Sequence, residues 1–210
     1  MIAGTAFGVA LNDRRQLEER AADFNQAPYK AQPAGPVLYI KPRNCFSGGG
    51  ARIELPVQLS KVDAAATIGL LFARDLSRAA EDEVSQAIGA ACLALDISES
   101  HDDFYRPAIR HRCRDGFLPL GSFAALPAQL GDIVTEIDGV EVHRWSLDRL
   151  VRPITTLCAE LSQFMTLAAG DLLLVGLPGD PPSVSSGQTL AVRAEGLPSL
   201  HTVVTTEVVH

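Results

Sequence analysis

Continuous apolar runs broken by glycine and proline recur along the chain, and they predict strands more often than helices. The runs at 4–11, 65–73 and 91–98 show little polar alternation, which is typical of strands buried on both faces. Residues 132–145 alternate around Asp138-Gly139, a pair that predicts a hairpin with a type I′ turn. Shorter strands are expected at 37–42, within 45–56, and at 170–180, 188–196 and 202–210.

Helical periodicity is confined to three segments: residues 12–25, 78–90 and 154–167. In the first, Asn12 or Asp13 is the expected N-cap, and Leu17, Ala21 and Phe24 are expected on one face. The second has acidic residues in its first turn, which suits the helix dipole. The third begins just after a proline.

Strands outnumber helices and do not alternate strictly with them, which predicts a β-rich α+β fold. The proline-rich segment 26–36 is expected to be a loop or lid. With no internal repeat and no low-complexity linker, we expect a single domain over 1–210. Residues 1–36 would supply a strand, a helix and the lid, and 37–210 the β core of catalytic type.

Composition narrows the classes of protein that fit. Hydrophobic residues make up 47% of the 210 positions and charged residues 20%, which excludes a disordered or nucleic-acid-coating chain. A net charge of −7 argues against a nucleic-acid partner, because duplex binding depends on many Lys and Arg contacts. Any anion bound by this chain is expected to be small.

Cysteine spacing and the apolar runs indicate the cell compartment in which the chain is expected. The four cysteines are widely spaced without a CxxC pair, which fits a reducing cytosol better than a disulfide framework or a zinc site. The opening apolar run fits a strand better than a signal peptide, and no stretch approaches the about 20 residues of a membrane helix. We therefore expect a cytoplasmic protein without a membrane partner.

The segment FYRPAIRHRCRDGF, residues 104–117, gathers arginines in an otherwise acidic chain. Guanidinium groups bind carboxylates in bidentate fashion, so Arg106, Arg110 and Arg112 beside Tyr105 would suit a di- or tricarboxylate. The alternative is a surface loop whose arginines offset neighbouring aspartates, and the residues alone leave both open.

Two further residues stand at the ends of apolar strands. Asp96 closes CLALD, where a carboxylate is costly to bury unless it pairs with a charge or binds a metal; otherwise it caps the next turn. Lys41 in YIKP would reach an anion or enolate, or would merely extend to solvent. The VGLPGD segment would bring backbone amides near a ligand. The histidines show no metal-binding spacing.

Ordered motifs along the whole chain resemble the fumarylacetoacetate hydrolase family. They are GVALNDRRQLEE, PVLYIKPRN, IELP, the run from IGLLFARDL to ALDIS, RDGFLPLG, ELSQFMTLAAGDLLLVGLP and AEGLP. Within the family, the segments FNQAPYKAQP and YRPAIRHRCRDGF are most similar to the amino-terminal half of one group of members. These members decarboxylate and isomerise intermediates of 4-hydroxyphenylacetate (homoprotocatechuate) catabolism. The resemblance implies the family's mixed β-sandwich or roll with a few short helices.

The resemblance also implies a chemistry. Family members act on 2-oxo acids with Mg²⁺ or Mn²⁺, which stabilises the enolate. The implied substrate is 5-oxopent-3-ene-1,2,5-tricarboxylate, which loses CO₂ before the product isomerises. The implied catalytic residues are Lys41, Arg112 and Glu19, and the implied substrate-binding residues are Tyr105, Arg106, Arg110, Gly176 and Pro178.

The metal ligands depart from the family pattern. The family's Glu-x-Glu corresponds to Ala65 and Thr67, and only the third carboxylate remains, as Asp96. Asp63 shares a strand face with residues 65 and 67 and is a candidate substitute. Gln16 replaces the lid histidine, and Leu177 replaces the threonine of Thr-Gly-Thr-Pro. Because Mg²⁺ prefers several oxygen ligands, the metal site is expected to be weak or absent.

Three functions remain open at this point. The chain is an enzyme subunit that holds a tricarboxylate through Arg112, Lys41 and Tyr105, or it is a metal-deficient structural partner of a complete paralogous subunit. A non-catalytic carboxylate-binding module is the third possibility. A homodimer or a hetero-oligomer with that paralogue is expected.

Overall fold

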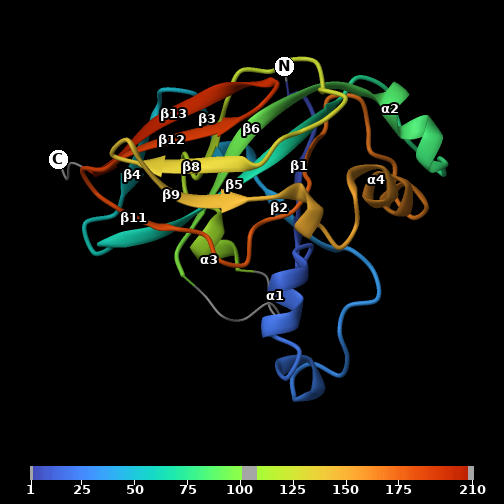
Figure 1. Cartoon of the computed structure of the whole chain (residues 1–210), viewed down its shortest axis with the longest axis horizontal. Helices are drawn as coiled ribbons and strands as arrows, with labels where there is room; N and C mark the ends of the chain where they lie inside the picture. The colour runs from blue at the N-terminus through green and yellow to red at the C-terminus, as the bar shows by residue number, and fades with distance from the viewer. Residues whose placement is uncertain (1, 101–107, 208–210) are drawn as a thin grey trace.

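Two β-sheets form the body of the chain, and the computed structural model describes residues 2–100 and 108–207 (Figure 1). The larger sheet runs through β2 (Val37–Lys41), β1 (Ala6–Ala10), β10 (Leu172–Leu174), β5 (Lys61–Phe72), β6 (Ile88–Ser98), β7 (Leu118–Leu120) and β3 (Phe46–Gly48), with β11 (Ser183–Ser185) also paired to β5. The smaller sheet runs through β4 (Arg52–Leu55), β13 (Leu197–Thr206), β12 (Thr189–Ala194), β8 (Ile133–Ile137) and β9 (Val140–Trp145).

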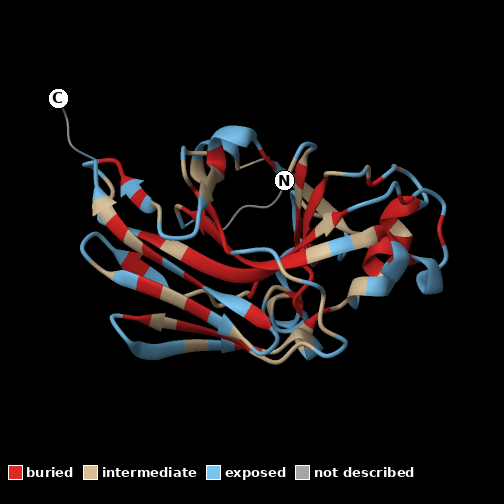
Figure 2. Cartoon of the chain, turned by 90° about the horizontal axis from the view of Figure 1, so that it is seen from above, coloured by how far each residue is buried: buried red, intermediate tan, exposed pale blue. Residues whose placement is uncertain are grey.

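The antiparallel pair β5–β6 is the centre of the larger sheet. Most residues of both strands are buried, and one face of the pair belongs to the main hydrophobic core together with residues of the smaller sheet and α4. Figure 2 shows buried residues along the central strands and exposed ones mainly in outer strands and loops. The register places Ala65 opposite Asp96, so these two side chains lie on the same face of the sheet.

Helices are few and short. They are α1 (Arg14–Glu19), α2 (Val84–Ala87), α3 (Ile109–Arg112) and α4 (Ile154–Ser162), with 3₁₀ turns at 23–25, 43–45, 81–83 and 147–149. In Figure 1, α2 and α4 lie together at one end of the molecule, whereas α1 projects beyond the sheets and the 26–36 loop runs back toward β2 on its right. Within the described residues, no helix is long and apolar enough to cross a membrane.

The strand-rich α+β fold expected from the sequence is confirmed, as are several local details. Asp138 and Gly139 have φ values of 52° and 80°, the left-handed pair that a type I′ turn requires. Asp13 caps α1, since its carboxylate accepts a hydrogen bond from the Arg15 amide at 3.2 Å. Residues 26–36 contain neither helix nor strand.

Some predicted elements are wrong in extent. The helix expected at 78–90 ends at Ala87, because Ile88 pairs with Phe72 and starts β6. The first helix ends at Glu19, and Ala21 is exposed in the turn that follows instead of packing with the buried Leu17 and Phe24. The strand expected at 170–180 covers only β10, because the Gly176–Gly179 segment leaves the sheet.

Candidate functional site

A buried carboxylate, Asp96, is the centre of a compact cluster of charged and polar side chains. It stands near the end of β6 and is fully buried. One of its oxygens, Oδ1, lies 3.0 Å from Lys41 Nζ and 3.0 Å from Arg112 Nη1. Oδ2 accepts a very short hydrogen bond from the Tyr39 hydroxyl. Both oxygens of Asp96 are therefore engaged by the protein itself.

Lys41 lies behind Asp96 and away from solvent. Its side chain has no exposed surface, and its ammonium also donates to the carbonyls of Ile97 at 3.1 Å, Arg112 at 2.6 Å and Phe117 at 3.0 Å. These three carbonyls and the carboxylate surround an ammonium that has three N–H donors. The geometry gives Lys41 a structural role that ties β2, β6 and the end of α3 together. Its expected contact with substrate stays a prediction.

Tyr39 reaches Asp96 because β1 leaves room for its ring. Gly8 stands opposite Tyr39 in the β1–β2 register, and a Cβ on Gly8 would lie 2.0 Å from the tyrosine Cζ. Burial and the adjacent Asp96 carboxylate raise the pKa of Tyr39 well above its usual value. The Tyr39 hydroxyl therefore stays protonated and acts as a donor to Asp96.

Arg112 is held on two sides. Its Nη1 donates to Asp96, and its Cζ lies 4.8 Å from the centroid of the Tyr39 ring, in cation–π geometry. Burial acts to lower the pKa of Arg112, but Asp96 and Tyr39 outweigh it and the pKa is raised, so the guanidinium stays charged. The side chain retains 13% exposure.

A cavity of about 170 Å³ opens beside this cluster. Arg112 lines it together with residues in or next to β1, α1, β5 and β6 and with the 177–181 loop: Ala10, Leu11, Gln16, Arg20, Asp63, Ala65, Ser98, Ser100, Leu177, Pro178, Gly179 and Pro181. Six positions singled out in the sequence therefore lie on one cavity: Arg112, Asp63, Ala65, Gln16, Leu177 and Pro178. Arg20, Ser98 and Ser100 were not among the residues predicted from the sequence.

The residues present do not fit the family's divalent metal. Ala65, opposite Asp96, has no ligand atom, and the Thr67 hydroxyl is buried and donates to the Gly176 carbonyl at 2.5 Å. Asp63 stands opposite Ser98, one diagonal step from Asp96, and accepts from the Ser183 hydroxyl at 2.9 Å. No group of three or more His, Cys, Asp or Glu side chains arranged to hold a metal occurs among residues 2–100 and 108–207.

The arginine-rich segment does not converge as one site in the part that the structure describes. Tyr105 and Arg106 lie outside the described residues. Arg110 is exposed on α3, whereas Arg114 turns to Glu99, with Nε 2.7 Å from Oε1. Among the arginines of this segment that the structure describes, only Arg112 reaches the Asp96 cluster.

Of the remaining predicted site residues, Pro178 lines the cavity, whereas Glu19 and Gly176 do not. Glu19 is on the exposed side of α1, where it pairs with Arg15 at 2.8 Å. Gly176 is buried, and a Cβ there would lie 3.0 Å from Leu150 and 3.2 Å from Asn12, so both side chains would have to shift to admit a larger residue. Pro178 lines the cavity directly.

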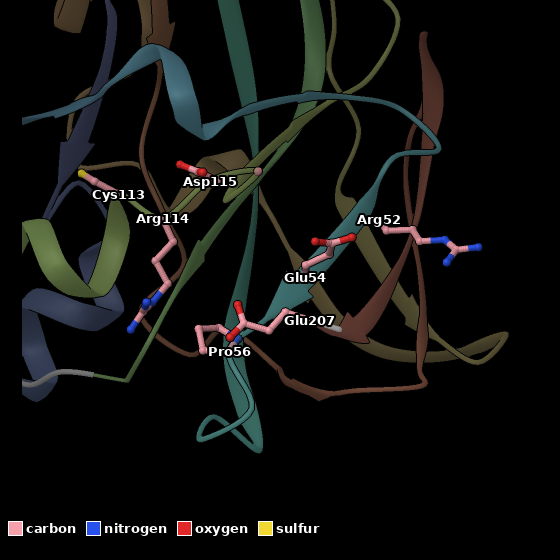
Figure 3. Close-up of a pocket in the computed structure, with 8 residues that line it drawn as sticks. Arg52, Glu54, Pro56, Cys113, Arg114, Asp115 and Glu207 are labelled. Carbon is pink, nitrogen blue, oxygen red and sulfur yellow. The ribbon is translucent and has the colours of Figure 1, made fainter. Parts of the chain in front are cut away.

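A second cavity, of about 600 Å³, lies between β4, the 113–116 turn and Glu207 (Figure 3). Its charged residues are of both signs, and in Figure 3 the Arg114 side chain extends away from Arg52 and Glu54. Because none of the residues predicted to carry chemistry lines it, we take the smaller cavity beside Asp96 as the candidate site.

Tyr39 is the main residue that the sequence reading missed. Its signal was available, because Tyr39 and Lys41 are two positions apart on a strand and so share a face. The contacts of Arg112 had no such signal, since Asp96 and Arg112 come from separate elements and meet only in the folded chain.

Comparison with known proteins identifies the family to which the fold belongs. The family model for the fumarylacetoacetate (FAA) hydrolase C-terminal domain matches residues 5–205. A 4-hydroxyphenylacetate degradation bifunctional isomerase/decarboxylase of Escherichia coli is 40% identical over 205 residues, which are 97% of this chain and 48% of that protein. The chain thus spans about half the length of this curated relative.

Solved structures agree on the fold. The 5-carboxymethyl-2-hydroxymuconate delta-isomerase of Mycobacterium smegmatis superposes with a TM-score of 0.83 at 22% identity, covering 99% of this chain and 78% of the other. Fumarylpyruvate hydrolase of Pseudomonas aeruginosa, solved with Mn²⁺ and pyruvate, gives 0.82 at 18% identity, with 97% and 90% coverage. With the family model matched from residue 5 to residue 205, the chain belongs to the fumarylacetoacetate hydrolase family.

Proposed function

We propose that this chain is the metal-free component of an isomerase/decarboxylase in 4-hydroxyphenylacetate catabolism. Acting as a single domain, it contributes to the conversion of 5-oxopent-3-ene-1,2,5-tricarboxylate and of the hydroxymuconate-type product. A second, paralogous domain with an intact Glu-x-Glu carries the metal that stabilises the enolate. The partner is a separate subunit or a fused domain.

One observation carries this proposal: the Asp96 carboxylate is already occupied. A metal ligand must offer free lone pairs, and Tyr39, Lys41 and Arg112 engage three of the about four lone-pair sites of the Asp96 carboxylate. Opening Asp96 to a metal would leave the buried Lys41 ammonium without its counter-charge, which is costly. This geometry supports a partner-dependent role over an independent metal enzyme.

The relatives support the pathway. The E. coli protein that is 40% identical carries both named activities, and this chain covers 48% of it. A protein of that length has room for a second domain of comparable size, in which a complete metal site would complement the present chain.

Affinity purification of the tagged chain from its host, grown on 4-hydroxyphenylacetate, tests the proposal. We expect a family member with Glu-x-Glu and bound divalent metal to co-purify in equimolar amount, unless both domains lie on one polypeptide. The complex should convert the tricarboxylate, and the isolated chain should not. Full, Mg²⁺-dependent turnover by the isolated chain would contradict the proposal.

A second candidate is decarboxylation by this chain without metal. It is favoured by the position of Arg112, whose cation lies on the cavity wall where it would stabilise an enolate. Turnover by the isolated chain that persists in excess chelator would select this function over the first.

A further inference from the structure

The charge of Asp96 is balanced from behind by Lys41. The ammonium is fully buried, 3.0 Å from Oδ1, and fixed by three carbonyls. Asp96 thus has a permanent counter-charge inside the protein, on the side away from the cavity. Because Lys41 already neutralises this carboxylate, Arg112, which contacts the same oxygen, is available for another role.

Arg112 is held where it meets the cavity. Asp96 fixes Nη1, the Tyr39 ring lies against the guanidinium, and Lys41 holds the Arg112 carbonyl at 2.6 Å. A guanidinium fixed in this way loses little conformational entropy when a ligand binds. Its planar fork matches the two oxygens of a carboxylate.

The strand position paired with Asp96 carries no charge. Ala65 stands there and presents only a methyl group to the cavity. Arg20 at the end of α1 and the hydroxyls of Ser98 and Ser100 add donors to the lining. Among the described residues of the lining, Asp63 is the one acidic side chain, and it accepts from Ser183.

The size of the cavity limits the ligand. At about 170 Å³ it is smaller than the roughly 300–1,000 Å³ of sites that enclose a drug-sized molecule. It therefore suits one end of an acid, a carboxylate with a few carbons, and leaves the rest of a longer substrate outside.

We propose that this cavity is a metal-independent receptor for the carboxylate end of a 2-oxo acid, in which Arg112, docked on Asp96, supplies the positive charge that a divalent ion supplies in relatives. The inference rests on the proposed function, since it names the ligand class of the same cavity. It differs in that binding would persist with every divalent ion removed.

Calorimetric titration of the chelator-treated chain tests this directly. Pyruvate and 2-oxoadipate are the probes, methyl pyruvate is the uncharged control, and each titration is run with excess EDTA and with Mg²⁺. We expect saturable binding of both acids, changed less than about twofold by Mg²⁺, and no binding of the ester. Absence of acid binding in EDTA would overturn the inference.

Substitutions of Arg112 test whether this side chain binds the acid. Arg112→Met should weaken acid binding roughly tenfold or more, as expected for loss of a charge-assisted hydrogen bond. Arg112→Lys should retain part of it, and Arg144→Met, an exposed arginine paired with Glu141, is the matched control with unchanged affinity. If Arg112→Met does not fold, Arg112→Lys and the EDTA titrations decide the question. Wild-type affinity in both Arg112 variants would overturn the inference.

Titration with Mn²⁺ alone distinguishes a failure of the proposed metal-free function from a failure of the carboxylate receptor. Saturable metal binding by the wild-type chain contradicts the proposed function. Absent metal binding together with absent acid binding overturns only the receptor.

Discussion

At the scale of single residues, the cluster around Asp96 is a buried network of one carboxylate, two cations and a tyrosine. Lys41 and Arg112 contact the same oxygen, and Tyr39 donates to the other. Buried charges of this kind are tolerated only when they are paired and hydrogen-bonded. Each member therefore depends on the others.

Removing the ammonium tests this dependence. Lys41→Met should lower the free energy of unfolding by about 3–5 kcal/mol, because three carbonyls and Asp96 lose a buried donor. Urea unfolding measures the change. Lys61→Met, at an exposed position of β5, is the control and should stay within about 0.5 kcal/mol of wild type. Equal stability of the two variants would show that Lys41 is not the structural cation described above.

At the scale of elements, the cavity walls are joined through one buried aspartate. Asp13 caps α1, accepts from the Gly179 amide at 2.7 Å and bonds Arg149, whose Nη2 lies 2.9 Å from Asp180. Helix α1 and the 177–181 loop, both of which contribute to the cavity lining, are thereby fixed to each other.

Loss of the Asp13 charge should loosen this connection. Asp13→Asn should cost about 1–3 kcal/mol of stability and speed hydrogen exchange in residues 14–25, because Arg149 and Gly179 lose an ionised acceptor. The exposed Asp23→Asn serves as control. Exchange rates that match the control would mean that α1 is held by other contacts.

The β5–β6 register also predicts how a metal site is regained. Ala65 faces Asp96, and residue 67 is on the same strand face, so Ala65→Glu and Thr67→Glu with Arg112→Met should place three carboxylates together. We expect Mn²⁺ to raise the melting temperature of this triple variant but not that of wild type. Adding Asp96→Asn should abolish the effect. A triple variant that is indifferent to Mn²⁺ would refute the assignment of these positions.

Prediction from sequence succeeded where the signal was local. The Asp138-Gly139 turn, the Asp13 cap and the buried runs of β5 and β6 are each set by neighbouring residues. It failed where tertiary pairing overrides periodicity, as when Ile88 joins β6 instead of continuing a helix. That Arg112 alone among the described arginines of its segment reaches Asp96 follows from the packing of α3 on β6, which no local pattern encodes.

At the scale of the whole molecule, the fold buries three of the four thiols. Burial raises the pKa of Cys45, Cys92 and Cys158 to about 12, and Cys113, also raised, is only partly buried. We expect a thiol reagent at neutral pH to label Cys113 first and slowly in the native chain, and all four after unfolding, as measured by mass spectrometry. Fast native labelling of Cys92 or Cys158 would contradict this packing.

The central claim is that the protein's own cations have taken the place of the metal on Asp96. Calorimetric titration of the chelator-treated chain with Mn²⁺ and Mg²⁺ measures this most directly. We predict no saturable binding up to about 1 mM, the weak end of natural divalent-cation sites. Saturable binding at micromolar concentrations that disappears in Asp96→Asn would contradict the account.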